Sequence, residues 1–180
     1  MPTAYIGLGA NLASFAGPPP ETLAAALLQL GGLGRVAARS SLYNTDPVGF
    51  ADQPQFVNAV IALETDLEPA ELLKKLLEIE KEYGRDRSQG IPNGPRTLDL
   101  DILLIDDLEI NEPGLELPHP RLAERTFVLI PLSEIAPQLR VPGQGKTVAE
   151  LVQALHNRSK GETDAVVRME SDRWRPAPQP

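Results

Sequence analysis

The stretch GPRTLDLDILL (residues 94–104) has the aliphatic and β-branched content of a strand, yet it also carries two acidic residues. Successive side chains of a strand point to opposite faces, so one face is expected to carry Thr97, Asp99 and Asp101 and the other Leu98, Leu100 and Ile102. Two like charges roughly 6 Å apart repel by about 3 kcal/mol at an effective dielectric constant near 20. A positive group is therefore expected between Asp99 and Asp101, unless the outer face of this strand is simply solvated.

This stretch is the last strand of a predicted six-element motif. Strands are expected at residues 3–9, 35–43, 56–63 and 94–104, and helices at 21–30 and 69–84. Loops rich in Gly, Pro, Asn and Asp, at residues 44–54 and 85–95, precede the last two strands. The order β-α-β-β-α-β predicts an α+β fold of the ferredoxin-like class, an αβα sandwich with a mainly antiparallel sheet.

Additional elements are expected after this motif. The predictions are a small strand pair at residues 108–110 and 115–117, a helical turn or two within 121–132, a short helix at 147–155 and an edge strand at 165–169. We expect a catalytic domain at residues 1–158 and a polar, proline-rich, flexible tail at residues 159–180.

The composition excludes several kinds of site and partner. The 180 residues include no cysteine, so disulfides, thiolate nucleophiles and thiolate zinc sites are excluded. A net charge of -8 disfavours nucleic-acid binding, and no run has the length of a membrane helix or the pattern of a signal peptide. We therefore expect a cytoplasmic protein without a nucleic-acid or membrane partner. A monomer is expected as well.

Arginines gather near the paired acids despite the negative net charge. Between positions 85 and 125 the sequence has Arg85, Arg87, Arg96, Arg121 and Arg125. Guanidinium forks fit phosphate oxygens, so such a group on an acidic protein indicates a bound polyanion. Ordinary surface salt bridges are the alternative explanation.

Two glycine-containing segments do not qualify as nucleotide motifs. PGQGKTVAEL lacks the first glycine of a P-loop because Arg140 stands in its place, and IGLGANL has Leu12 where the third glycine of the dinucleotide fingerprint belongs. A purely structural role is open for both histidines, but His119 lies among arginines in LPHPRLAERTF, which makes it a better candidate than His156.

Four segments together form a specific pattern. They are TDPVGFADQPQFVNAVIALET, EIEKEYGRDR, GPRTLDLDILL and LPHPRLAERTFVLIPLSEIAP, and AYIGLGANL near the N-terminus fits with them. Over residues 3–155 the chain closely resembles the 6-hydroxymethyl-7,8-dihydropterin pyrophosphokinase family of folate biosynthesis. The resemblance implies a ferredoxin-like fold and the transfer of diphosphate from ATP to the hydroxymethyl group of a reduced pterin, which leaves AMP.

The resemblance also implies roles for individual residues. Catalytic positions are matched by Arg85, Arg96, Asp99 and Asp101, with Asp99 and Asp101 as ligands of two Mg²⁺ ions. ATP-binding positions are matched by Glu80, Arg85, Arg87, Arg96, Ile102, His119 and Arg125. Pterin-binding positions are matched by Thr45, Asp46, Val48, Phe56, Asn58 and Phe127, and the two phenylalanines sandwich the ring. Because Mg²⁺ commonly takes one or two carboxylates together with substrate phosphates, this activity accounts for the paired aspartates.

Four positions depart from the family pattern. Asn93 stands where many relatives have tryptophan, Pro120 replaces a tyrosine of some members, and no nucleotide contact is carried over to Gly114 or Glu116. Two other functions stay open at this point: a two-metal nucleotidyl transferase, which would release pyrophosphate, and a non-catalytic ligand-binding module, which would not depend on magnesium. For the pyrophosphokinase we hypothesise ordered closure, in which ATP and magnesium bind first and loops 44–54 and 85–95 then fold over both substrates.

Overall fold

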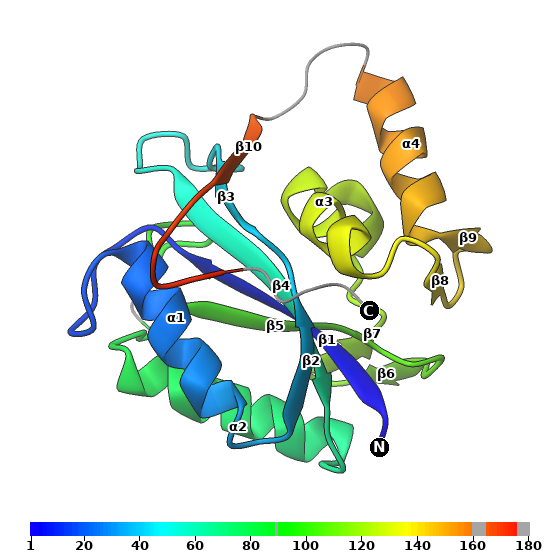
Figure 1. Ribbon diagram of the computed structural model, residues 1–180, viewed down its shortest axis with the longest axis horizontal. Coiled ribbons are helices and arrows are strands. Elements are labelled where there is room, and N and C mark those ends of the chain that lie inside the picture. Colours follow the sequence, from blue (N-terminus) through cyan, green and yellow to red (C-terminus); the bar gives the residue numbers. More distant parts are fainter. Residues whose placement is uncertain (89, 160–164, 176–180) are drawn as a thin grey trace.

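Six strands form one antiparallel sheet with helices on both faces in the computed structural model, which describes residues 1–88, 90–159 and 165–175 (Figure 1). The strands are β1 (Thr3–Ala10), β2 (Arg35–Arg39), β3 (Leu42–Thr45), β4 (Phe56–Glu64), β5 (Asp99–Ile105) and β10 (Val166–Met169). The order is β10-β3-β4-β1-β5, and β2 also pairs with β4. Because every pairing of this sheet is antiparallel, the predicted α+β class with a mainly antiparallel sheet is confirmed.

The remaining elements lie around this sheet. The helices are α1 (Pro19–Leu30), α2 (Pro69–Glu82), α3 (Thr126–Ile135) and α4 (Val148–Ser159), with a 3-10 turn η1 (Leu122–Glu124) before α3. Two small sheets are formed by β6 (Ile110–Glu112) with β7 (Leu115–Leu117) and by β8 (Arg140–Val141) with β9 (Lys146–Thr147). No helix in the described ranges is both long and apolar enough to cross a membrane.

Helices lie on both faces of the sheet (Figure 1), and a hydrophobic core lies on each face. On the face of α1 and α2, alternate residues of β1 such as Ile6 and Leu8 pack against Leu23 of α1 and Leu76 of α2. On the other face, α3 and α4 pack over part of the sheet around Val60 and its neighbours. α3 and α4 leave part of this second face uncovered, and a pocket lined by Gly9 of β1 and Asn58 of β4 lies there.

The predicted strand at residues 35–43 is wrong in one respect, because the structure divides it into β2 and β3. The division falls at Ser40 and Ser41, which are both buried. The Ser40 hydroxyl donates to the Ser41 carbonyl (2.7 Å) and accepts the Val60 N–H (2.9 Å), so a side chain takes the place of a regular ladder bond. Serine hydroxyls compete with backbone partners in this way, and the strand therefore breaks.

Other predicted boundaries shift by a few residues. α1 begins at Pro19 because proline suits a first helical turn, where its missing N–H has no helical partner to lose. β5 begins only at Asp99, because the Arg96 carbonyl accepts the N–H groups of Asn11 (3.0 Å) and Leu12 (3.2 Å) outside the regular β1–β5 register. The small strand pair is present, with its first strand at Ile110–Glu112.

The predicted edge strand at residues 165–169 is confirmed as β10, which pairs with β3. After it, Trp174 is buried, with 3% of its surface exposed. The expected flexible tail at residues 159–180 thus contains a paired strand and a core residue, while residues 160–164 and 176–180 lie outside the described part of the chain. The domain boundary at residue 158 stays a prediction.

Candidate active site

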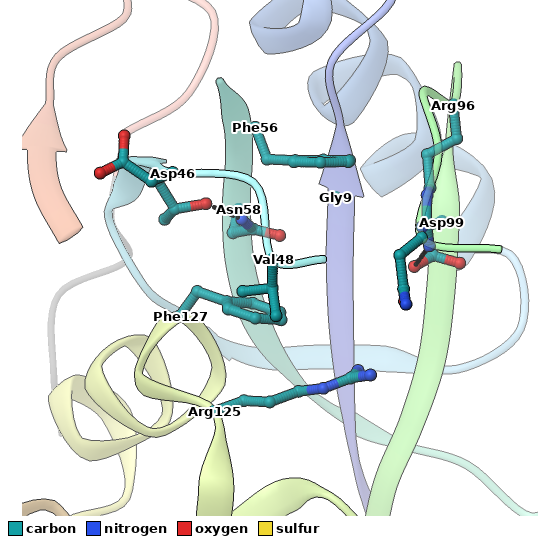
Figure 2. Close-up of a pocket in the computed structure, with 11 residues that line it drawn as sticks. Gly9, Asp46, Val48, Phe56, Asn58, Arg96, Asp99, Arg125 and Phe127 are labelled. Carbon is teal, nitrogen blue, oxygen red and sulfur yellow. Dashed lines mark hydrogen bonds and ion pairs between the residues drawn. The ribbon is translucent and has the colours of Figure 1, made fainter. Parts of the chain in front are cut away.

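The floor of the candidate site is a row of residues across three neighbouring strands. Gly9 of β1 lies opposite Asn58 of β4 on one side and Asp99 of β5 on the other. A Cβ added to Gly9 would come within 2.6 Å of the Asn58 Oδ1, so any larger residue would push into the amide. The absence of a side chain at Gly9 therefore leaves open the space between Asn58 and Asp99 (Figure 2).

Above this floor lies a pocket between two aromatic rings (Figure 2). Its lining consists of Gly9, Thr45, Asp46, Val48, Phe56, Asn58, Asn93, Arg96, Asp99, Arg125 and Phe127. The structure thus brings together all six residues that were predicted to bind the pterin. Each ring borders a guanidinium, with Arg96 5.4 Å from the centroid of Phe56 and Arg125 5.5 Å from that of Phe127. A flat polar molecule could stack in this slot within reach of two positive charges.

Three arginines surround Asp99 and supply the positive charge that was expected beside the paired acids. The Asp99 Oδ1 is 2.6 Å from Arg85 and 3.6 Å from Arg87, and its Oδ2 is 2.9 Å from Arg96. The two closest guanidiniums have less than a fifth of their side-chain surface exposed. Because these charges are partly shielded from water, their attraction is stronger than that of an exposed surface pair.

Asp101 lies two residues further along β5 and lines a second pocket at the outer edge of the sheet. That pocket also includes the predicted residues Arg87, Ile102 and His119, together with leucines of α2 and β7. Burial, followed by repulsion from Asp99 and Glu80, raises the pKa of Asp101 to about 7, although Arg125 and Arg87 act in the opposite direction. Burial and the neighbouring carboxylates thus outweigh the two arginines at Asp101.

Glu80 lies beneath these pockets, and its side chain is 2% exposed. Its carboxylate accepts two hydrogen bonds from the Arg87 guanidinium, both 2.9 Å, and the Leu100 N–H at 2.7 Å. Burial, and to a lesser degree repulsion from Asp99, raises the pKa of Glu80 despite these donors. In this structure Glu80 orients Arg87 and holds β5, so its predicted contact with the nucleotide stays a prediction.

His119 is held as a neutral ring at the rim of the second pocket. Burial, and next the charge of Arg125, lowers its pKa. The backbone N–H of His119 donates to the Leu103 carbonyl (2.7 Å), and the ring Nδ1 of His119 accepts the backbone N–H of Arg121 (3.1 Å). A ring whose Nδ1 accepts carries its proton on Nε2, which is then a donor for a ligand.

Sequence reasoning missed two residues that connect the loops around the site. Asn11 is buried, and its Nδ2 donates to the Gln53 Oε1 (2.9 Å) and the Pro54 carbonyl (3.0 Å), while its Oδ1 accepts the Arg96 N–H (2.8 Å). The Gln53 Nε2 in turn donates to the Asn93 carbonyl (2.7 Å). Loops 44–54 and 85–95 are therefore joined through one amide pair. The sequence shows only that Asn11 is a polar residue directly after a buried strand. This position does not reveal which distant residues Asn11 contacts.

Replacing Asn11 by alanine is expected to weaken the fold and to separate these loops. The partly buried N–H of Arg96 would lose its acceptor, and such a loss costs up to about 1–3 kcal/mol of folding free energy. Urea unfolding measures this loss, and hydrogen exchange at Gln53 and Asn93 reports loop separation. Asn11→Asp keeps the acceptor and removes the donors, so it should separate the loops with a smaller loss of stability; Asn111→Ala, at an exposed position of β6, is the control. Unchanged exchange in Asn11→Ala would contradict the proposed link.

An aromatic slot beside two carboxylates, one of them bound by arginines, fits an enzyme that transfers phosphoryl groups, in which catalysis rests on positioning and charge. A sequence profile described as 7,8-dihydro-6-hydroxymethylpterin-pyrophosphokinase (HPPK) matches residues 5–137. The 2-amino-4-hydroxy-6-hydroxymethyldihydropteridine pyrophosphokinase of Pseudomonas aeruginosa is 47% identical over 152 residues, which are 83% of this chain and 90% of that relative. The enzyme of the same name from Bacillus subtilis is 46% identical over 139 residues, 76% of this chain and 79% of that relative. The chain belongs to the 7,8-dihydro-6-hydroxymethylpterin-pyrophosphokinase family. The predicted class of activity, a pyrophosphokinase of folate biosynthesis, is thereby confirmed.

The fold has a counterpart among solved structures. The wild-type HPPK-DHPS of Plasmodium falciparum superposes with a TM-score of 0.69 at 15% sequence identity, over 88% of this chain. The match spans 45% of that longer chain. At this identity the likeness concerns the fold alone.

Proposed function

We propose that the pocket between Phe56 and Phe127 binds the reduced pterin and that the second pocket, at the edge of β5, binds ATP. The observation that carries this proposal is the convergence of six residues from β3, β4, α3 and their loops around one slot next to Asp99. Asp99 lines the first pocket and Asp101 the second, so the carboxylate pair lies where the two substrates would meet.

The two aspartates fit a magnesium site that is completed by the substrate. No cluster of three or more metal-ligating side chains occurs in the part of the chain that the structure describes. Mg²⁺ needs few protein ligands when phosphates supply the others, and Asp99 and Asp101 lie two residues apart on β5. We infer that Asp99 and Asp101 hold two Mg²⁺ ions, which would neutralise the phosphates of ATP.

The remaining residues would bind and orient the substrates. Phe56 and Phe127 stack on the pterin ring, and Asn58 with Thr45, joined by a 2.6 Å hydrogen bond, contacts its polar edge. Arg85, Arg87, Arg96 and Arg125 stabilise charge on the triphosphate. The pterin hydroxyl oxygen then bonds to the β-phosphorus, the bond between that phosphorus and the AMP oxygen breaks, and the hydroxyl proton passes to solvent.

Product identification tests this function directly. Incubation with ATP, magnesium and 6-hydroxymethyl-7,8-dihydropterin should give AMP and the pterin diphosphate in equal amounts. Release of pyrophosphate would instead indicate a nucleotidyl transferase. Binding of the pterin without any turnover would indicate a ligand-binding module.

Four further expectations are part of this proposal. The strand order β5-β1-β4 followed by β2 and β3, with α1 and α2 on one face, supports the ferredoxin-like topology. Ordered closure of the loops is tested by hydrogen exchange with a non-reactive ATP analogue and pterin, which should protect both loops. Monomeric state and cytoplasmic location are tested by light scattering and by cell fractionation.

A further inference from the structure

The C-terminal arm, residues 165–175, lies along the strand that leads into the proposed pterin pocket (Figure 1). In β10, Val166 lies opposite Thr45, which lines this pocket. The pairing continues one residue further, since the Asp46 N–H donates to the Ala165 carbonyl and the Ala165 N–H donates to the Asp46 Oδ2, both at 3.3 Å. The arm therefore contacts a residue of the pocket wall.

Asp46 connects the arm to the far side of the pterin loop. While its Oδ2 accepts from Ala165, its Oδ1 accepts from the Gln55 Nε2 at 2.8 Å. Gln55 directly precedes β4, which carries Phe56 and Asn58. The carboxylate of Asp46 thus spans from the arm to the beginning of β4, across the loop whose residues line the pocket.

Trp174 anchors the arm at its other end. The indole is buried in the core shared with α1 and α2, and its Nε1 donates to the Ser40 carbonyl at 2.8 Å. Ser40 lies in the break between β2, which ends at Arg39, and β3, which begins at Leu42, so its carbonyl is available for a side-chain donor. The Arg39 guanidinium also donates to the Arg175 carbonyl. The arm is therefore held at both ends of β3.

The arm pairs with β3, which would otherwise be an edge strand. Without β10, β3 would be an edge strand with a row of unpaired N–H and C=O groups, and such strands fray more readily than paired ones. Fraying at the end of β3 would move Thr45 and Asp46, and with them one wall of the slot. The match to the family profile ends at residue 137, so the arm lies outside the matched region.

We propose that the C-terminal arm is a positioning element for the pterin pocket and that Trp174 is its anchoring residue. By ordering Thr45 and Asp46 before the substrate arrives, the arm favours binding of the planar substrate and has no contact with the second pocket. The proposal rests on the proposed function only for the identity of the bound molecule.

The test compares Trp174→Ala with the unaltered full-length chain. Hydrogen exchange of the Thr45 and Asp46 amides, measured without ligand, should become about tenfold faster because the end of β3 opens more often. The KM for the pterin should rise about tenfold, whereas the KM for ATP and kcat should stay within about twofold. Val167→Ala is the matched control, since this side chain of the same arm is exposed and the variant should behave as the unaltered chain.

Trp174→Phe separates anchoring from core packing. This variant keeps an aromatic ring in the core but cannot donate to Ser40, so smaller increases in amide exchange and in the pterin KM are expected. If Trp174→Ala does not fold, Trp174→Phe is the variant to measure. Unchanged exchange and unchanged pterin KM would overturn the inference, as would an equal rise in both KM values. If the unaltered chain formed no pterin diphosphate, the proposed function would fail, while ligand-free exchange would still decide whether the arm orders the pocket wall.

Discussion

Replacing Asp99 or Asp101 by alanine is expected to abolish AMP formation from ATP and the pterin. Each change removes a carboxylate from the position where the triphosphate and its metal ions would meet. Loss of a single group that stabilises developing charge commonly lowers kcat by about 10²–10³-fold, and loss of a metal ligand should do at least as much. The rate of AMP release, measured by chromatography at saturating substrates, gives the result.

The fold should survive these replacements. Neither residue belongs to the hydrophobic cores, and the arginines around Asp99 keep partial access to water. Circular dichroism and urea unfolding should therefore resemble those of the unaltered chain. Asp107→Ala is a suitable control, because this exposed aspartate lies in the turn just after β5. Full activity in Asp99→Ala or Asp101→Ala would rule out the metal assignment.

Replacing Arg96 by alanine is expected to lower kcat by about 10²–10³-fold, the usual loss for a donor that stabilises charge in the transition state. Arg96 lies at the junction of the site, 2.9 Å from the Asp99 Oδ2 and over the ring of Phe56. The KM for the pterin should rise less, because a cation over an aromatic ring contributes only about 0.5–1 kcal/mol at exposed sites and about 2 kcal/mol when desolvated. Steady-state kinetics with each substrate varied in turn separates the two effects.

Two further variants make the result specific. Arg96→Lys keeps the charge but not the planar fork, so partial recovery of kcat is expected. Arg140→Ala removes an exposed arginine of β8 and should leave kcat unchanged. If Arg96→Ala raised only the pterin KM and left kcat unaltered, Arg96 would be a binding residue rather than a catalytic one.

The paired acids show which features of the site can be predicted from the local sequence pattern. Alternation along residues 94–104 correctly predicted that Asp99 and Asp101 share a face while Leu100 packs into the core. The repulsion expected between the two acids correctly predicted positive groups beside Asp99, where Arg85 and Arg96 form ion pairs. Alternation failed at residues 35–43, because whether the Ser40 hydroxyl takes a ladder position depends on Val60, which lies on another strand.

Some pocket contacts could be predicted from the sequence, and others only the structure shows. A resemblance in short motifs assigned six residues to the pterin, and the structure brings them to one slot: Thr45, Asp46, Val48, Phe56, Asn58 and Phe127. The link from Asn11 to Gln53 and the contact of Asp46 with Ala165 join residues that are far apart in the chain, and no local pattern marks them. Glu80 likewise looked like a ligand contact, but in this structure its carboxylate binds Arg87 and the Leu100 N–H.

The sequence alone predicted the α+β class, the two aspartates on one face of a strand and the family to which the motifs belong. These features depend on backbone periodicity and on neighbours within a few positions, which the sequence displays directly. Folding in three dimensions decided which arginine meets which carboxylate, how Asn11 joins the loops and where Trp174 anchors the arm. Those contacts depend on the packing of helices against both faces of a sheet, because burial, not sequence spacing, determines which polar groups must find one another.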